Sequence, residues 1–130
     1  MKRKSIFALA IIAVLTIASG VSVFAATQDF AGTTRGDSWQ RVSGTAVKKT
    51  TERNPWVNWT YSEYGNIHKQ WFTIVQNNKS DGVGEVRMDG YGTSDISDNQ
   101  AGIGKSYYLK SKREHFIDPG TYVSGTWSPN

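Results

Sequence analysis

The sequence contains no cysteine, and this absence excludes three classes of protein at once. A disulfide scaffold, a thiolate metal site and a cysteine nucleophile all need the side chain that is missing. Proline is also scarce, with 3 in 130 residues. A small domain without disulfides depends on its core for stability. Here 5 Trp and 6 Tyr are available to fill that core.

An excess of charge of one sign is lacking as well, once the N-terminal segment is set aside. The formal net charge of +4 includes Lys2, Arg3 and Lys4, which we assign to a leader below. Without these three of the 15 basic residues, 12 remain against 11 acidic residues. A nucleic-acid-binding domain needs a basic stripe on its folded surface. We therefore expect no nucleic-acid partner.

Residues 1–25 have the parts of a secretory signal peptide. Three basic residues precede an apolar segment from Ile6 to Ile17, and Val23 and Ala25 occupy the small-residue positions of a cleavage site. A retained membrane anchor is the alternative, but the apolar segment is short for a span of about 20 residues. We predict cleavage after Ala25, a secreted protein and no stable membrane span after cleavage. A secreted chain without cysteine fits a Gram-positive bacterium.

The stretch from Pro55 to Gln76 has the densest aromatic and β-branched composition in the chain. Residues 56–61 and 71–76 both alternate as half-buried strands do, and Gly65 lies in the break between them. We therefore predict a β-hairpin at the centre of a small sheet. On its first strand, alternation predicts one shared face for Val57, Trp59 and Tyr61.

The remaining residues predict an all-β protein. Residues 26–37 are polar and have no periodicity, so we expect a flexible N-terminal arm. Outside the leader, no stretch has helical spacing over more than one turn. Short strands with turn signals every 8 to 12 residues or so are typical of a small antiparallel β-sandwich of about six or seven strands, placed over residues 38–130. The expected segments are a strand over 38–50 with a bulge at Gly44, a strand over 83–91 with Val86 and Met88 inward, a loop over 92–102, and strands over 103–112 and 121–127.

No arrangement of residues predicts catalysis, a cofactor or a metal site. The two histidines, His68 and His115, are far apart in the sequence and have no metal-ligand spacing. No serine occupies a recognisable nucleophile turn. We therefore expect a protein that is not an enzyme. A small secreted hydrolase is the alternative, and it requires one of these histidines to be essential.

The aromatic side chains exceed what one face of a small sheet buries. Tyr107 and Tyr108 are adjacent, so their rings must point to opposite faces of a strand. Either a sandwich covers both faces, or one face is exposed and can stack on sugar rings or contact a partner. For each residue, a place in the core is the alternative. The candidate binding residues are Trp56, Trp59, Tyr61, Tyr64, Trp71, Tyr107, Tyr108 and Trp127.

Basic residues near the end of the chain form a second candidate feature. They are Lys105, Lys110, Lys112 and Arg113. Such a group is suited to form a basic rim for an anionic wall polymer. A surface that only keeps the protein soluble explains it equally well.

Short motifs resemble those of the lactococcin-like bacteriocins. Residues 61–64 (YSEY), 75–78 (VQNN) and 104–108 (GKSYY) are similar to the Y-S-x-Y, V-x-N-N and K-x-x-Y-Y succession of that family. The last motif is tighter here, with one residue between Lys105 and Tyr107. Residues 122–130 (YVSGTWSPN) are similar to the V-S-G-x-W-x-P-D ending of small uncharacterised exported proteins of Gram-positive bacteria. The chain is longer than typical family members and adds a Lys/Arg-rich segment and a strand after the tyrosine pair.

The resemblance implies a small, exported β-sandwich that acts on the envelope of neighbouring cells through a cell-wall precursor. Together with the leader and the surplus of aromatic residues, it predicts a secreted bacteriocin-like protein that works by binding, without catalysis. The alternative is a non-toxic accessory module that binds carbohydrate or the cell wall.

Overall fold

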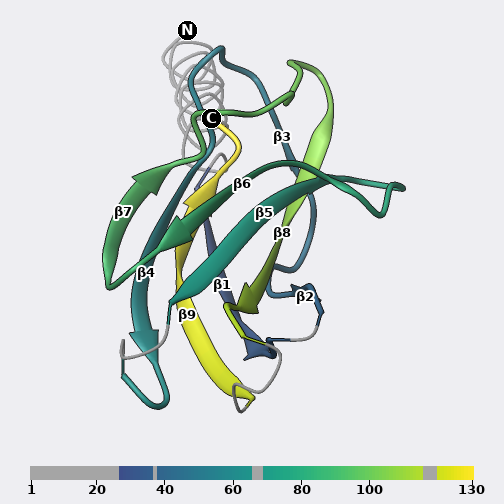
Figure 1. Ribbon diagram of the computed structural model, residues 1–130. Coiled ribbons are helices and arrows are strands. Elements are labelled where there is room, and N and C mark those ends of the chain that lie inside the picture. The colour runs from purple at the N-terminus through teal and green to yellow at the C-terminus, as the bar shows by residue number, and fades with distance from the viewer. Residues whose placement is uncertain (1–26, 37, 66–68, 116–119) are drawn as a thin grey trace, which may run out of the picture.

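The structure is a computed structural model that describes residues 27–36, 38–65, 69–115 and 120–130. The predicted signal peptide and His68 lie outside these residues. The described residues form two antiparallel sheets that face each other (Figure 1) and contain no helix. The prediction of an all-β fold is confirmed.

The first sheet, called sheet A, has the strand order β1-β9-β4-β7. The second, sheet B, has the order β2-β8-β5-β6, and β3 also pairs with β8. The strands are β1 (Gln28–Thr34), β2 (Gln40–Arg41), β3 (Val47–Lys48), β4 (Trp56–Ser62), β5 (Gln70–Gln76), β6 (Gly82–Met88), β7 (Gly92–Asp95), β8 (Ser106–Arg113) and β9 (Thr121–Ser128). Both sheets consist of antiparallel neighbours, so each strand has one face toward the other sheet and one face away from it.

The core lies between the two sheets and is rich in aromatic rings. The ring of Phe72 on β5 meets Phe30 on β1 at 5.4 Å and Trp59 on β4 at 6.3 Å, so it joins sheet B to sheet A. Each buried aromatic side chain removes a large apolar area from water. The buried hydrophobic cluster comprises Phe30, Val42, Val47, Val57, Trp59, Phe72, Ile74, Met88, Ile96, Tyr107, Leu109, Val123 and Trp127.

The predicted central hairpin is wrong, because its two strands belong to different sheets. Strand β4 lies between β9 and β7, whereas β5 lies between β8 and β6. Both are interior strands with two neighbours, which explains their dense aromatic and β-branched composition. Composition identifies an interior strand but not its partners, since those partners come from distant parts of the chain.

The predicted flexible arm is wrong over residues 28–34, which form β1. This strand pairs with β9 along its whole length, from Gln28 opposite Trp127 to Thr34 opposite Thr121. Phe30 anchors it in the core with an exposed fraction of 2%. The strand lies at the edge of sheet A, and Phe30 is its single large apolar residue, so its sequence lacks a strong apolar alternation.

Two further segments differ from the prediction, and the strand count rises to nine among the described residues. The expected loop over 92–102 contains β7, a short edge strand. The strand expected over 38–50 is split into β2 and β3, with Gly44 in the break. On β6, Met88 is buried and Val86 packs against the core, as predicted, but Val83 packs against the core too, where the register with β5 shifts between Thr73 and Val75.

A β-bulge in β4 redirects one tyrosine to the surface. The register with β9 shifts between Trp59, opposite Gly125, and Tyr61, opposite Ser124. The extra residue turns Tyr61 outward and Ser62 inward. The expectation that Tyr61 shares a face with Trp59 is therefore wrong.

Polar contacts connect the segment between β3 and β4 to Pro129 and Asn130, the last two residues of the sequence. Lys49 is buried, and its ammonium group donates to the carbonyl oxygens of Pro129, at 2.6 Å, and Arg53. The side-chain oxygen of Asn130 accepts hydrogen bonds from the backbone N–H groups of Thr50, at 2.6 Å, and Thr51, at 2.9 Å. These contacts satisfy backbone groups that no strand partner reaches.

Burial lowers the pKa of Lys49 from its ordinary value of 10.5. Between the lowered pKa and 10.5, the unfolded chain binds more protons than the folded chain, so the free energy of unfolding rises with pH. The Lys49→Met variant lacks this rise and both hydrogen bonds. We expect it to lose about 1–3 kcal/mol at neutral pH, and more as the pH increases. Urea unfolding of both proteins at several pH values in this range measures the difference. If the free energies of unfolding of the two proteins changed with pH in parallel, the lowered pKa would not belong to Lys49.

Candidate binding site

The structure places three of the eight predicted binding residues in the core. Trp59, Tyr107 and Trp127 have exposed fractions of 0–1%. Their rings fill the space between the sheets, where no ligand reaches them in the folded domain. For these three residues the structural alternative, a place in the core, holds.

Three more predicted residues lie on the outer faces of the sheets. Trp56 is half-buried on the outer face of sheet A, and Trp71 is half-buried on the outer face of sheet B. Tyr108 faces out from sheet B, opposite in direction to Tyr107 as predicted, but the guanidinium of Arg41 covers it at 4.2 Å from the ring centroid. None of these three rings is widely exposed.

The other two predicted residues, Tyr61 and Tyr64, are exposed, and the structure adds Tyr91 and Tyr122 to them. The four exposed fractions are 42–54%. Tyr61 ends the outward face of β4 and contacts Tyr122, and Tyr64 lies in the following turn. Because Tyr91 packs on the inward-facing Trp59, it lies away from the outward-facing Tyr61 and Tyr122. We call Tyr61, Tyr64 and Tyr122 the tyrosine patch.

Contacts hold two pairs of rings in this region in place. Tyr61 and Tyr122 meet edge to face, with ring centroids 6.3 Å apart. Tyr91 meets the buried Trp59 edge to face at 5.0 Å, and its hydroxyl oxygen accepts a hydrogen bond from the N–H of Ser62 at 3.0 Å. Because these rings are already positioned, binding costs little side-chain entropy.

Hydrogen-bonding groups surround the tyrosine patch. A carboxylate oxygen of Glu63 accepts a bond from the N–H of Tyr122 at 3.3 Å, which holds this acidic group beside the ring. The exposed hydroxyl of Thr60 donates to the carbonyl of Ser124 at 3.3 Å. Apolar ring faces beside a few fixed polar groups are typical of small-ligand sites.

The predicted basic rim is divided by the fold. Lys110 and Lys112 lie on the outer face of sheet B, whereas Arg113 points inward and is 1% exposed. Lys105 is exposed in the turn before β8. Alternation along β8 separates Arg113 from its neighbours. The sequence did not predict this, because the expected strand ended at residue 112, whereas β8 extends to Arg113.

Neither a cluster of potential metal ligands nor a long apolar helix occurs among residues 27–36, 38–65, 69–115 and 120–130. No group of three or more His, Asp or Glu side chains there could hold a metal ion. Among the same residues, no helix is long and apolar enough to cross a membrane. His115 is exposed on the surface. The expectation that the protein is not an enzyme stays a prediction.

Sequence reasoning missed Tyr91 and Tyr122 for different reasons. Tyr122 alternates with the core residues Val123 and Trp127 on β9, so its outward direction was readable from parity. Tyr91 lies between two glycines, where no periodicity exists, and only the fold brings it to β4.

In comparisons with known proteins, no family model, no curated protein and no solved structure matches this chain. The candidate site is therefore judged by its geometry.

Proposed function

We propose that this protein is a secreted, non-enzymatic protein that binds a glycan of the bacterial cell envelope, with the tyrosine patch as its binding surface. The observation that carries the proposal is the exposure of three tyrosine rings near the end of β4, two of which, Tyr61 and Tyr122, contact each other. Single exposed apolar side chains are common, whereas exposed aromatic rings in contact with each other, such as Tyr61 and Tyr122, are typical of an interaction surface.

The chemistry of the patch suits a sugar. The flat face of a tyrosine ring can stack on the apolar C–H face of a pyranose, while its hydroxyl group remains free to bond to water or ligand. The carboxylate of Glu63 can accept hydrogen bonds from sugar hydroxyl groups. Tyrosine supplies this contact area at low entropic cost because it has only two side-chain torsions.

Killing of neighbouring bacteria is the fuller form of this proposal. It is supported by the predicted leader and by the resemblance of residues 61–64, 75–78 and 104–108 to lactococcin-like motifs. Purified protein spotted on lawns of related Gram-positive bacteria tests it. Clearing zones would support a bacteriocin-like protein that acts on the envelope. The absence of zones on a broad panel would leave the alternative, a non-toxic carbohydrate- or wall-binding module.

The double variant Tyr61→Ala/Tyr122→Ala is expected to bind isolated Gram-positive cell walls more weakly. If each ring contributes about 0.5–1.5 kcal/mol of stacking, the loss is about 1–3 kcal/mol, or about 5- to 160-fold in affinity. Cosedimentation with a titration of wall material measures this change.

Ile103→Ala provides the matched control. Ile103 is 55% exposed. The N–H of the next residue, Gly104, donates to the carbonyl oxygen of Lys49, so Ile103 lies near the start of β4, whereas the patch lies near the end of that strand. We expect its wall binding to be unchanged. Wild-type affinity in the tyrosine variant, or an equal loss in the Ile103 variant, would contradict the proposed site.

A further inference from the structure

The outer face of sheet B carries three cations in a row, named here the cationic row. Arg41 on β2 is directly opposite Lys110 on β8, and Lys112 follows on the same face of β8. Like charges directly opposite one another destabilise an antiparallel pair. An anion bound outside the fold would relieve the repulsion between these neighbouring charges.

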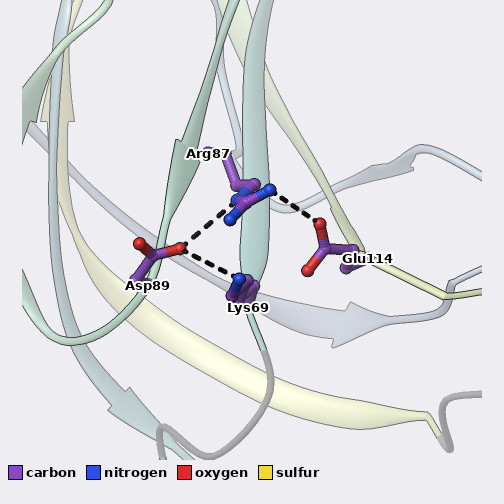
Figure 2. Close-up of polar contacts among 4 residues, drawn as sticks. All are labelled: Lys69, Arg87, Asp89 and Glu114. Atoms are coloured by element: carbon purple, nitrogen blue, oxygen red, sulfur yellow. Dashed lines mark hydrogen bonds and ion pairs between the residues drawn. The ribbon is translucent and has the colours of Figure 1, made fainter.

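Within the described ranges, no ion pair joins the cationic row to a carboxylate. Elsewhere on the same sheet, basic side chains do have acidic partners. Figure 2 shows Asp89 between Lys69, at 3.9 Å, and Arg87, at 3.3 Å. Arg87 also meets Glu114 at 3.1 Å (Figure 2). The charge of Arg87 is thus neutralised within the protein. The Arg41 guanidinium donates to the carbonyl oxygens of Ser43, at 3.1 Å, and Gly44, so the ammonium groups of Lys110 and Lys112 are the charges of the row that a ligand can best reach.

Aromatic rings support the charged groups of the cationic row. The Lys112 ammonium lies 4.8 Å from the ring centroid of Trp39. The Arg41 guanidinium and the Lys110 ammonium lie 4.2 Å and 5.8 Å from the centroid of Tyr108. Cation–π attraction at these distances positions the charges on the sheet surface before any ligand arrives.

A hollow of about 270 Å³ adjoins the cationic row. It is lined by Trp39, Thr73, Gly82, Gly84, Glu85 and Asp98. It is continuous with the row because Thr73 is directly opposite Lys110 and Trp39 lies under Lys112. A Cβ at Gly82 would come 2.1 Å from the Thr73 hydroxyl oxygen, so this floor requires glycine.

The two regions have complementary chemistry. The carboxylates of Glu85 and Asp98 repel an anion from the hollow but can accept hydrogen bonds from hydroxyl groups, and Trp39 offers a ring face. The cations of the row, about 7 Å apart along β8, attract phosphate. We propose that the cationic row and the hollow form a second binding site, for a polymer in which phosphodiester groups alternate with polyol or sugar units. This site is separate from the tyrosine patch and lies on the other sheet.

Binding of purified poly(glycerol phosphate), measured by calorimetry at several salt concentrations, tests the proposal. The wild-type protein is expected to bind, and Lys110→Gln/Lys112→Gln to bind at least tenfold more weakly. Loss of two phosphate contacts should reduce the slope of log affinity against log salt by about 1.4. The variant should fold normally, since it removes the repulsion between Arg41 and Lys110; its melting temperature checks this.

Arg53→Gln/Lys105→Gln is the control, because it removes the same net charge from two exposed residues near Lys49. We expect its affinity to match the wild type. An equal loss in this control, no binding by the wild type, or tighter binding to single-stranded DNA or to anionic lipid vesicles would overturn the proposal. Tyr61→Ala/Tyr122→Ala should retain poly(glycerol phosphate) binding, so failure at one site is distinguishable from failure at the other.

Discussion

Gly125→Ala is expected to destabilise the domain by about 3 kcal/mol or more, or to prevent folding. A Cβ at this position would lie 1.9 Å from the carbonyl oxygen of Asn58 and 2.9 Å from the ring of Phe30. The first contact is with backbone in the neighbouring strand, so no side-chain rotation relieves it. Separating β9 from β4 would break the middle of sheet A. Urea unfolding followed by Trp fluorescence measures the loss.

Gly44→Ala is the matched control for this substitution. A Cβ there has no atom within 4 Å, so the added methyl group meets open space in the break between β2 and β3. We expect the free energy of unfolding to be unchanged or raised by up to about 1 kcal/mol, because alanine restricts the unfolded chain. If both alanine variants were equally stable, the close approach of β4 and β9 at Gly125 would be incorrect.

Trp127→Ala is expected to cost about 3–5 kcal/mol. The indole ring is fully buried among both sheets, and its removal leaves a cavity that the rigid neighbouring strands cannot close. Tyr122→Ala, on the same strand but facing out, should cost less than about 1 kcal/mol. Thermal or urea unfolding of the two variants compares them directly. Similar losses would mean that Trp127 is not a core residue, and would reopen its predicted role in binding.

These two predictions bear on function because β9 and β4 present the tyrosine patch. The bulge opposite Gly125 turns Tyr61 outward, and pairing of β4 with β9 brings Tyr122 beside it. The side of these strands that faces the core is therefore responsible for stability, while the outer side is free to bind. A substitution such as Gly125→Ala should lose both properties, whereas Tyr61→Ala should lose binding alone.

The sequence was sufficient for the fold class because strand alternation is local information. The alternation of Phe72 and Ile74 with Trp71 and Thr73 was correct, since it depends only on the pleat of one strand. Strand pairing was not predictable in the same way. Whether β4 pairs with β5 or β9 depends on contacts between residues more than 60 positions apart, such as Trp56 with Ser128.

The candidate site was only partly predictable for a related reason. Tyr61 and Tyr64 were identified, yet Tyr61 was placed on the wrong face because a one-residue bulge reverses parity from that point onward. Trp59, Tyr107 and Trp127 were included because aromatic type alone does not distinguish a core residue from a surface one. Edge strands β1 and β7 were missed, since half of each strand faces water and carries polar residues.

The most direct test of the proposed function is a titration of the ¹⁵N-labelled protein with soluble fragments of cell-wall glycan, followed by amide chemical shifts. We predict that the largest shifts fall at Tyr61, Glu63, Tyr64 and Tyr122, with small changes in the core. Shifts that fall only on the outer face of sheet B, or no shifts at saturating glycan, would contradict the assignment of the tyrosine patch as the glycan-binding surface.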